Sequence, residues 1–198
     1  MGRFFRRAIM RISFTGPGCS GKSTLLKKCQ EYYGDRFEYI PEVTRPALHK
    51  GMKINEDGDS KTQLYILEEH MRNDKLQNVI MDRCIIDGWV YTTWLHGEGK
   101  VSEVVQKTYD KLYRELVDNL DIVFYTKPVE LEDDGERSTD PKFINEIQKF
   151  FDVTVATLHA HPEPDYNKPK IVVLEGDVDK RFDDIKLAIE QYEHSTVG

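Results

Sequence analysis

The sequence predicts an α/β protein of three layers, in which helices cover both faces of a five-stranded, mainly parallel sheet. Five short apolar segments alternate along the chain with longer segments in which apolar residues recur at helical spacing. The short segments are almost continuously apolar, which is typical of parallel strands that are buried on both faces. Strands are therefore expected at residues 11–15, 37–41, 78–81, 121–125 and 170–174.

The longer segments predict the helices. Leu64, Leu67 and Met71 show the spacing of three and four residues that brings apolar side chains to one helical face. Gly34 closes the first such segment. The stretch 45–60 is polar and interrupted by proline and glycine, so it predicts a loop with at most a short helix. Helices are expected at 21–33, 61–76, 87–95, 102–120, through 143–155, and at 178–192.

Length and composition narrow the class of protein. With 198 residues, of which 39% are hydrophobic and 32% charged, the chain fits one globular domain over 1–198, with 1–10 as a basic extension. Three cysteines without CxxC spacing argue against a disulfide framework. No apolar run approaches the ~18 residues of a membrane span. A net charge of −7 argues against broad nucleic-acid binding. We therefore expect a cytoplasmic protein without a membrane partner. It is expected to be a monomer or a homodimer, and Met1 and Met10 are both candidate starts.

One motif points directly to chemistry. The segment GPGCSGKST fits G-x-x-x-x-G-K-[ST], with a predicted strand before it and a predicted helix after it. Glycines let backbone N–H groups converge on phosphate oxygens, and the start of the helix adds a positive dipole end. Lys22 is expected to bridge the β- and γ-phosphates and Ser23 to offer a hydroxyl to Mg²⁺. The predicted nucleotide ligands are Gly16, Gly18, Cys19, Ser20, Gly21, Lys22, Ser23 and Thr24.

The rest of the chain decides which kind of protein carries this loop. A GTP switch has D-x-x-G after its third strand and N-K-x-D for guanine. Here the third strand leads into Asp82-Arg-Cys-Ile85, and the nearest N-K-x-D candidate ends in Lys170. Large ATPase motors need far more chain and an arginine finger from a neighbouring subunit. The kinases remain, with ATP and Mg²⁺ as cofactors.

The remaining motifs resemble those of the nucleoside and nucleotide kinases. The chain is most similar to small AAA-type ATP-binding domains like those of nicotinamide riboside kinases, and more distantly to deoxynucleoside and thymidylate kinases. The resemblance implies a kinase-like P-loop fold with a short lid at about 130–140. It also implies transfer of the γ-phosphoryl group of ATP to a hydroxyl or phosphate of a nucleoside or nucleotide. It is carried by Gly16–Thr24, Glu42-Val-Thr-Arg45, Asp82-Arg83, Asp134-Gly-Glu-Arg137 and Glu175-Gly-Asp177 with Arg181.

Candidate catalytic residues follow the second and third strands. Glu42 and Arg45 lie where open α/β folds bind ligands. A carboxylate there can accept a proton from an attacking hydroxyl, and an arginine can hold an anionic group of the acceptor. Asp82 ends the third strand, where a carboxylate holds Mg²⁺, and the resemblance implies that Arg83 contacts phosphate. Glu42 is the preferred base and Asp82 the preferred metal partner, although the sequence does not separate the two roles.

Two later segments complete the predicted nucleotide site. In the lid segment, Arg137 is the single cation among several acidic residues. The resemblance implies that it stabilises the transferring phosphoryl group, and a solvated acidic loop is the alternative. After the last strand, the resemblance places the backbone at Gly176 beside the adenine, and Arg181 is a candidate to stack on that base. A plain strand-to-helix turn also accounts for Gly176.

Aromatic and amide side chains suggest the acceptor pocket. Trp89, Tyr91 and Trp94 follow Asp87, and Gln63 opens an earlier helix. Such groups can sandwich a nucleobase and bind its edge, although aromatic residues at this spacing also fit a core. Asp87 is a candidate to bind a sugar hydroxyl or to cap its helix. Two other functions stay open: a kinase acting on a nucleic-acid end or a modified base in DNA, and a nucleotide-binding regulatory ATPase module.

Overall fold

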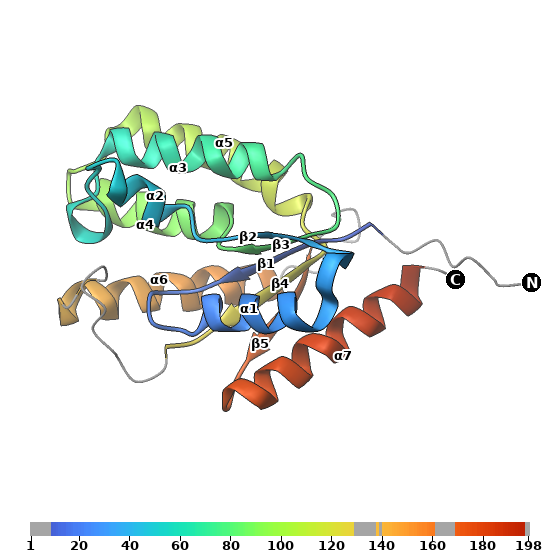
Figure 1. Cartoon of the computed structure of the whole chain (residues 1–198). Helices are drawn as coiled ribbons and strands as arrows, with labels where there is room; N and C mark the ends of the chain where they lie inside the picture. The colour runs from blue at the N-terminus through green and yellow to red at the C-terminus, as the bar shows by residue number, and fades with distance from the viewer. Residues whose placement is uncertain (1–8, 129–137, 139, 161–168, 197–198) are drawn as a thin grey trace, which may run out of the picture.

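The computed structural model of the chain describes residues 9–128, 138, 140–160 and 169–196. In this part of the chain a five-stranded sheet lies between helical layers (Figure 1). The strand order is β2-β3-β1-β4-β5, and each neighbouring pair is parallel. The predicted α/β fold of three layers is confirmed. The strands are Arg11–Thr15 (β1), Glu38–Ile40 (β2), Val79–Asp82 (β3), Ile122–Thr126 (β4) and Lys170–Leu174 (β5).

The predicted helices are present, with ends that shift by a few residues. The segment 45–60 contains one short helix and a 3₁₀ turn, as expected of a stretch with little regular structure. The helices are Lys22–Tyr33 (α1), Thr44–His49 (α2), Ser60–Asn73 (α3), Ile85–Gly97 (α4), Glu103–Asp118 (α5), Pro141–Ala160 (α6) and Val178–Thr196 (α7), with 3₁₀ turns at Gly34–Arg36 (η1) and Asn55–Asp57 (η2). None of the helices in the described part of the chain is long and apolar enough to cross a membrane.

The sheet separates two cores. On one face α1 and α7 lie side by side (Figure 1), and Leu25 and Ile185 pack with Ile12 and Phe124 of the sheet. On the other face α4 lies at the centre, between α5 and α6. Gly88 allows this close packing, because a Cβ there would come within 2.8 Å of Tyr109 Cε1 on α5. The start of α4 is thereby held firmly beneath the carboxyl ends of β1 and β3.

Several predicted functional segments meet at that edge of the sheet. The parallel strands β1, β2 and β3 all end there, so the phosphate loop, the segment before α2 and the segment between β3 and α4 lie close together. Asp82 is the last residue of β3, so the strand ends one residue later than the predicted bound of 81. Most of the predicted lid, including Arg137, and most of the N-terminal extension lie outside the described residues.

Candidate active site

The loop between β1 and α1 requires glycine at two positions. Gly16 has φ +138°, and a Cβ there would lie 2.3 Å from the Thr126 carbonyl oxygen. Gly21 has φ +82° and directly precedes α1. Side chains larger than hydrogen are strained at such φ values. The loop can therefore pack tightly on β4 and turn its backbone towards the start of α1.

Lys22 is buried, with its ammonium group inside this loop. Nζ donates to the Gly16 carbonyl at 2.9 Å, to the Pro17 carbonyl at 2.6 Å and to Ser20 Oγ at 2.9 Å. Burial, reinforced by the positive charge of Arg83, lowers the pKa of Lys22 to about 8. The ammonium group is thus held where phosphate oxygens could replace the loop oxygens that now surround it.

Ser23 and Asp82 form the pair of groups that suits Mg²⁺. Ser23 Oγ donates to Asp82 Oδ2 at 2.6 Å, whereas the buried Asp82 Oδ1 has no hydrogen-bond partner. Burial raises the pKa of Asp82, although the Lys22 charge opposes that change. No cluster of three His, Cys, Asp or Glu side chains that could hold a metal occurs among the described residues. Ser23 and Asp82 fit an Mg²⁺ ion that takes its other ligands from nucleotide phosphates and water.

Arg83 and Glu42 form an ion pair on the other side of the loop. Arg83 Nε lies 2.6 Å from Glu42 Oε1, and Thr44 Oγ1 donates to the same oxygen at 2.5 Å. Burial alone would raise the pKa of Glu42, but the charges of Arg83 and Lys22 outweigh it and lower that pKa to about 2. Burial opposes the charge of Arg83 too, yet Glu42 keeps the Arg83 pKa well above its usual value. Both groups are therefore charged at any working pH.

Arg83 also contacts the phosphate loop. Its Nη1 donates to the Gly16 carbonyl at 3.1 Å and to Asp87 Oδ1 at 2.9 Å. Asp87 in turn accepts from the Cys84 backbone N–H, and the two residues form a capping box at the start of α4. Of the two roles that the sequence allowed for Asp87, the structure shows the capping contact.

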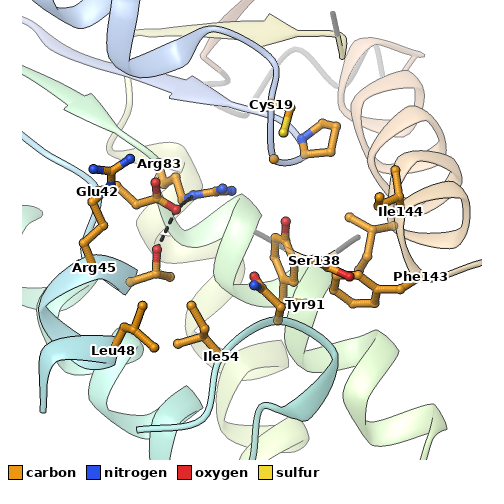
Figure 2. A pocket seen from close by; sticks show the side chains of 15 residues that line it. Cys19, Glu42, Arg45, Leu48, Ile54, Arg83, Tyr91, Ser138, Phe143 and Ile144 are labelled. Carbon is orange, nitrogen blue, oxygen red and sulfur yellow. Dashed lines mark hydrogen bonds and ion pairs between the residues drawn. The ribbon is translucent and has the colours of Figure 1, made fainter. Parts of the chain in front are cut away.

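A hollow opens beside this ion pair. It encloses about 640 Å³, including its open mouth, between the phosphate loop, α2, α4 and α6. Figure 2 shows Glu42 and Arg83 on one side, Phe143 of α6 on the other, and Cys19 of the loop between them. The Tyr91 ring lines the same hollow, with its centre 5.6 Å from Arg83 Cζ. Apolar side chains complete much of the remaining wall: Leu48, Ile54, Ile144 and Ile147.

A second hollow of about 440 Å³ adjoins the first and shares Glu42, Arg83 and Tyr91 with it. Gln63 and His70 of α3 both line this inner hollow. Gln63 Oε1 accepts from Thr92 Oγ1 at 2.9 Å, which leaves the amide nitrogen as its donor group. His70 Nε2 is buried without a hydrogen-bond partner, and burial lowers the pKa of His70 to about 3. The inner hollow thus offers an amide and a neutral imidazole.

Of the aromatic residues Trp89 and Tyr91 on α4, Tyr91 lines the hollows and Trp89 does not. Trp89 Nε1 donates to Asp110 of α5 at 2.8 Å, and the indole packs against Tyr113 with ring centres 5.1 Å apart. Trp89 is not among the residues that line the two hollows, whereas Tyr91 lines both. The sequence does contain a feature that favours Tyr91 over Trp89: Tyr91 lies four residues after Asp87 and hence on the same face of α4. His70 and Thr44 are further lining residues that the sequence interpretation missed.

The other predicted residues lie around this centre. Arg181 is buried and donates from Nη1 to the Ser20 carbonyl at 3.0 Å and from Nε to the Gly176 carbonyl at 2.9 Å, so it rests against the phosphate loop. Arg45 is an exposed residue of α2 and lines the outer hollow. Arg181 thus contacts the phosphate loop directly, whereas Arg45 lines the hollow beside it.

Fold and loop together define a nucleotide-binding P-loop domain of the kinase-like type. The model of an AAA domain family matches residues 11–181, and the chain belongs to this family. A search of curated protein sequences finds no significant match.

Solved structures share this fold at low sequence identity. Deoxyadenosine kinase from M. mycoides, with the products dCMP and dCDP bound, superimposes with a TM-score of 0.69 at 19% identity, covering 92% of this chain and 99% of the other. The NadR protein in complex with NR also gives a TM-score of 0.69, at 17% identity. That match covers 96% of this chain but only 53% of NadR, so the chain spans about half of that protein. The chain therefore has the fold of a P-loop nucleoside kinase.

Proposed function

We propose that the chain is an ATP- and Mg²⁺-dependent kinase that transfers the γ-phosphoryl group of ATP to a hydroxyl group of a nucleoside. One observation carries the proposal. Arg83 links the candidate base to the phosphate loop, because it donates to Glu42 Oε1 at 2.6 Å and to the Gly16 carbonyl at 3.1 Å. Base, cation and loop thus meet beside a hollow that can admit an acceptor. The shared fold with deoxyadenosine kinase and with NadR, described with NR, supports the nucleoside class.

The donor side would hold the triphosphate. Backbone N–H groups of the loop and the start of α1 bind the phosphates, and Lys22 exchanges its contacts with loop carbonyls for phosphate oxygens. Ser23 and Asp82 would hold Mg²⁺, which neutralises phosphate charge when it is bound. Arg181 lies against the Ser20 carbonyl and supports the loop from behind. It remains our candidate for the adenine contact together with Gly176, as Arg137 does for the phosphoryl group.

The acceptor side would orient the attacking hydroxyl. Glu42 lines both hollows, whereas Asp82 lines neither, which favours Glu42 as the proton acceptor and Asp82 as the metal partner. With its pKa near 2, Glu42 is a weak base, so it acts mainly by holding the hydroxyl in line. That is sufficient for phosphoryl transfer, in which positioning and charge neutralisation supply most of the rate enhancement.

The charges favour a nucleoside over a nucleotide as the acceptor. Among the described residues that line the hollows, the arginines are Arg45 and Arg83. The guanidinium of Arg83 already contacts the carboxylates of Glu42 and Asp87. The charge of Arg83 is therefore already balanced by two carboxylates, which leaves little attraction for an acceptor phosphate, whereas a neutral hydroxyl needs none. The amide of Gln63 and the imidazole of His70 suit a flat ring with a polar edge.

A coupled assay of ADP release tests the proposal. Nucleosides, nucleoside monophosphates and oligonucleotides are offered separately with ATP and Mg²⁺, and Lys22→Ala measures the background. We expect stimulation by nucleosides. Stimulation by oligonucleotides alone would favour the nucleic-acid kinase. ATP binding without any acceptor-stimulated turnover would favour the regulatory ATPase module and refute the kinase.

A further inference from the structure

Asp87 uses the whole accepting capacity of a buried carboxylate within the protein. The residue is 2% exposed, and each of its oxygens has at least two donors. Oδ1 accepts from Arg83 Nη1 at 2.9 Å and from the Gly16 backbone N–H at 3.3 Å. Oδ2 accepts from Thr15 Oγ1 at 2.8 Å and from the Cys84 backbone N–H at 3.2 Å. A carboxylate has about four lone-pair sites, so none remains for a substrate hydroxyl.

The donors come from the two halves of the site. Thr15 and Gly16 belong to the end of β1 and the start of the phosphate loop, whereas Arg83 and Cys84 follow β3. Asp87 stands at the third position of α4, a helix whose packing against α5 and α6 holds it in place. One side chain therefore joins the segment that binds ATP to the segment that carries the Glu42 partner.

Arg83 depends on this arrangement because its backbone is strained. Its φ is +84°, a conformation that is strained for a residue with a side chain and persists only where the surroundings impose it. Asp87 holds Arg83 from two directions, through the guanidinium and through the N–H of the next residue. Without these contacts the left-handed conformation would lose two of its restraints.

We propose that Asp87 is a positioning residue that holds Arg83, and through Arg83 the carboxylate of Glu42, in register with the phosphate loop. Although Asp87 lines the inner hollow, the hydrogen bonds that it accepts within the protein leave no site on its carboxylate for the acceptor. The inference rests on the proposed kinase function for its effect on turnover, but not for its effect on Arg83. Removal of the Asp87 charge is expected to lower kcat more than it raises either KM, because the substrates keep their own contacts.

A double-mutant cycle on kcat tests the link to Arg83. Asp87→Asn is expected to lower kcat by about 10- to 100-fold, the cost of misplacing a catalytic group. Arg83→Lys keeps the charge but loses the second nitrogen that reaches Asp87. If Asp87 acts through Arg83, the double variant is no slower than Arg83→Lys alone. Multiplication of the two effects would overturn the proposal.

Tyr125→Phe is the matched control. It removes a hydroxyl of a buried side chain that donates to Asp152 at 2.7 Å and lines neither hollow. The variant is expected to lower stability, to leave kcat unchanged and to combine with Arg83→Lys by simple multiplication. A fall in kcat equal to that of Asp87→Asn would show that lost stability explains both variants, and would overturn the positioning role.

A measurement without substrate separates this inference from the proposed function. The Nε–H of Arg83 donates to Glu42, so ¹⁵N NMR of the arginine side chains should show it protected from solvent exchange. Asp87→Asn should abolish this protection, and Tyr125→Phe should keep it. If Asp87→Asn does not fold, Thr15→Val removes one donor and should accelerate the exchange. Unchanged exchange overturns the inference even if turnover falls, whereas lost protection in a chain without kinase activity refutes only the proposed function.

Discussion

The phosphate half and the acceptor half of the site are built in different ways. The proposed phosphate half comes mostly from one continuous segment, Gly16–Thr24, in which backbone geometry would do most of the binding. The acceptor half gathers single side chains from separate elements: Glu42 before α2, Gln63 and His70 on α3, Arg83 after β3 and Tyr91 on α4. The first half is defined by local conformation, and the second by how helices pack on the sheet. The two halves should therefore respond differently to substitution.

The largest effect is expected in the phosphate half. Lys22→Ala removes the ammonium group at the centre of the loop and should lower kcat by about 10³-fold or more, because it loses charge stabilisation of the transferring group. ADP release with the best acceptor measures this effect. Lys27→Ala on the exposed face of α1 is the control and should be active. Turnover of Lys22→Ala close to that of the unaltered chain would refute the assignment of the loop.

The next effect concerns the shared boundary of the two halves. Glu42→Gln keeps the shape but removes the charge that holds the hydroxyl in line, accepts its proton and partners Arg83, so kcat should fall by about 10²- to 10⁴-fold. Binding of ATP, measured by calorimetry, should persist because the loop is intact. Glu38→Gln, at an exposed position of β2, is the matched control. Equal losses in kcat for both variants would argue against Glu42 as the base.

A smaller effect is expected deeper in the acceptor half. Gln63→Leu keeps the size of the side chain but removes its hydrogen-bond donor, so kcat/KM for the acceptor should fall by about 10- to 100-fold. The KM for ATP should stay unchanged, which a panel of initial rates can show. Gln30→Leu, at an exposed position of α1, is the control. A parallel rise in the KM for ATP would indicate that Gln63 supports the fold of both halves.

His70 should make the stability of the acceptor half sensitive to acid. Its pKa is lowered from 6.5 to about 3 in the folded chain, so between these values the unfolded chain binds more protons. The free energy of unfolding therefore decreases as the pH falls from 6.5 towards 3, by up to about 1.4 kcal/mol per pH unit. Urea unfolding near neutral pH and at about pH 5 should show a smaller change for His70→Gln, by about 1 kcal/mol or more.

Exposed His49 supplies the control for this measurement. His49→Gln should keep the pH dependence of the unaltered chain. If His70→Gln has the same pH dependence as His49→Gln, then the imidazole of His70 is not kept neutral by burial.

The smallest effect is expected at Trp89. Because its indole packs on Tyr113 and donates to Asp110, Trp89→Phe should lower stability slightly and leave the KM for the acceptor unchanged. Tyr91→Phe is the comparison in the hollow and should affect acceptor kinetics more. An increase in the acceptor KM for Trp89→Phe alone would return this residue to the acceptor site, as the sequence first suggested.

The sequence was informative where structure is local. The strand and helix periods predicted the order of the elements, and the loop motif predicted the turn between β1 and α1, because both depend on neighbouring residues. The prediction was weaker for the acceptor pocket. Trp89 and Tyr91 are two residues apart and lie on different faces of α4, and the rotation of α4 relative to the sheet decides which of these faces borders the hollow. His70 carried no signal of its own, since a histidine on a helix is ordinary until its burial is known.

Asp87 shows the same limit in another form. The sequence allowed a sugar contact or a helix cap, and both fit a carboxylate at the start of a helix. Besides the nearby Arg83 and Cys84, the Asp87 carboxylate accepts hydrogen bonds from Thr15 and Gly16, which lie more than sixty residues earlier in the chain. No local sequence pattern predicts these long-range contacts.

The sequence by itself determined the α/β architecture and a phosphate loop, because periodicity and glycine geometry act over a few residues. Only the tertiary structure decided that Glu42, Arg83 and Asp87 form one linked group beside that loop. The physical reason is that parallel strands bring their carboxyl ends to one edge of the sheet, where burial and opposite charges shift the properties of each group. Local sequence specifies the residues, whereas packing specifies their partners.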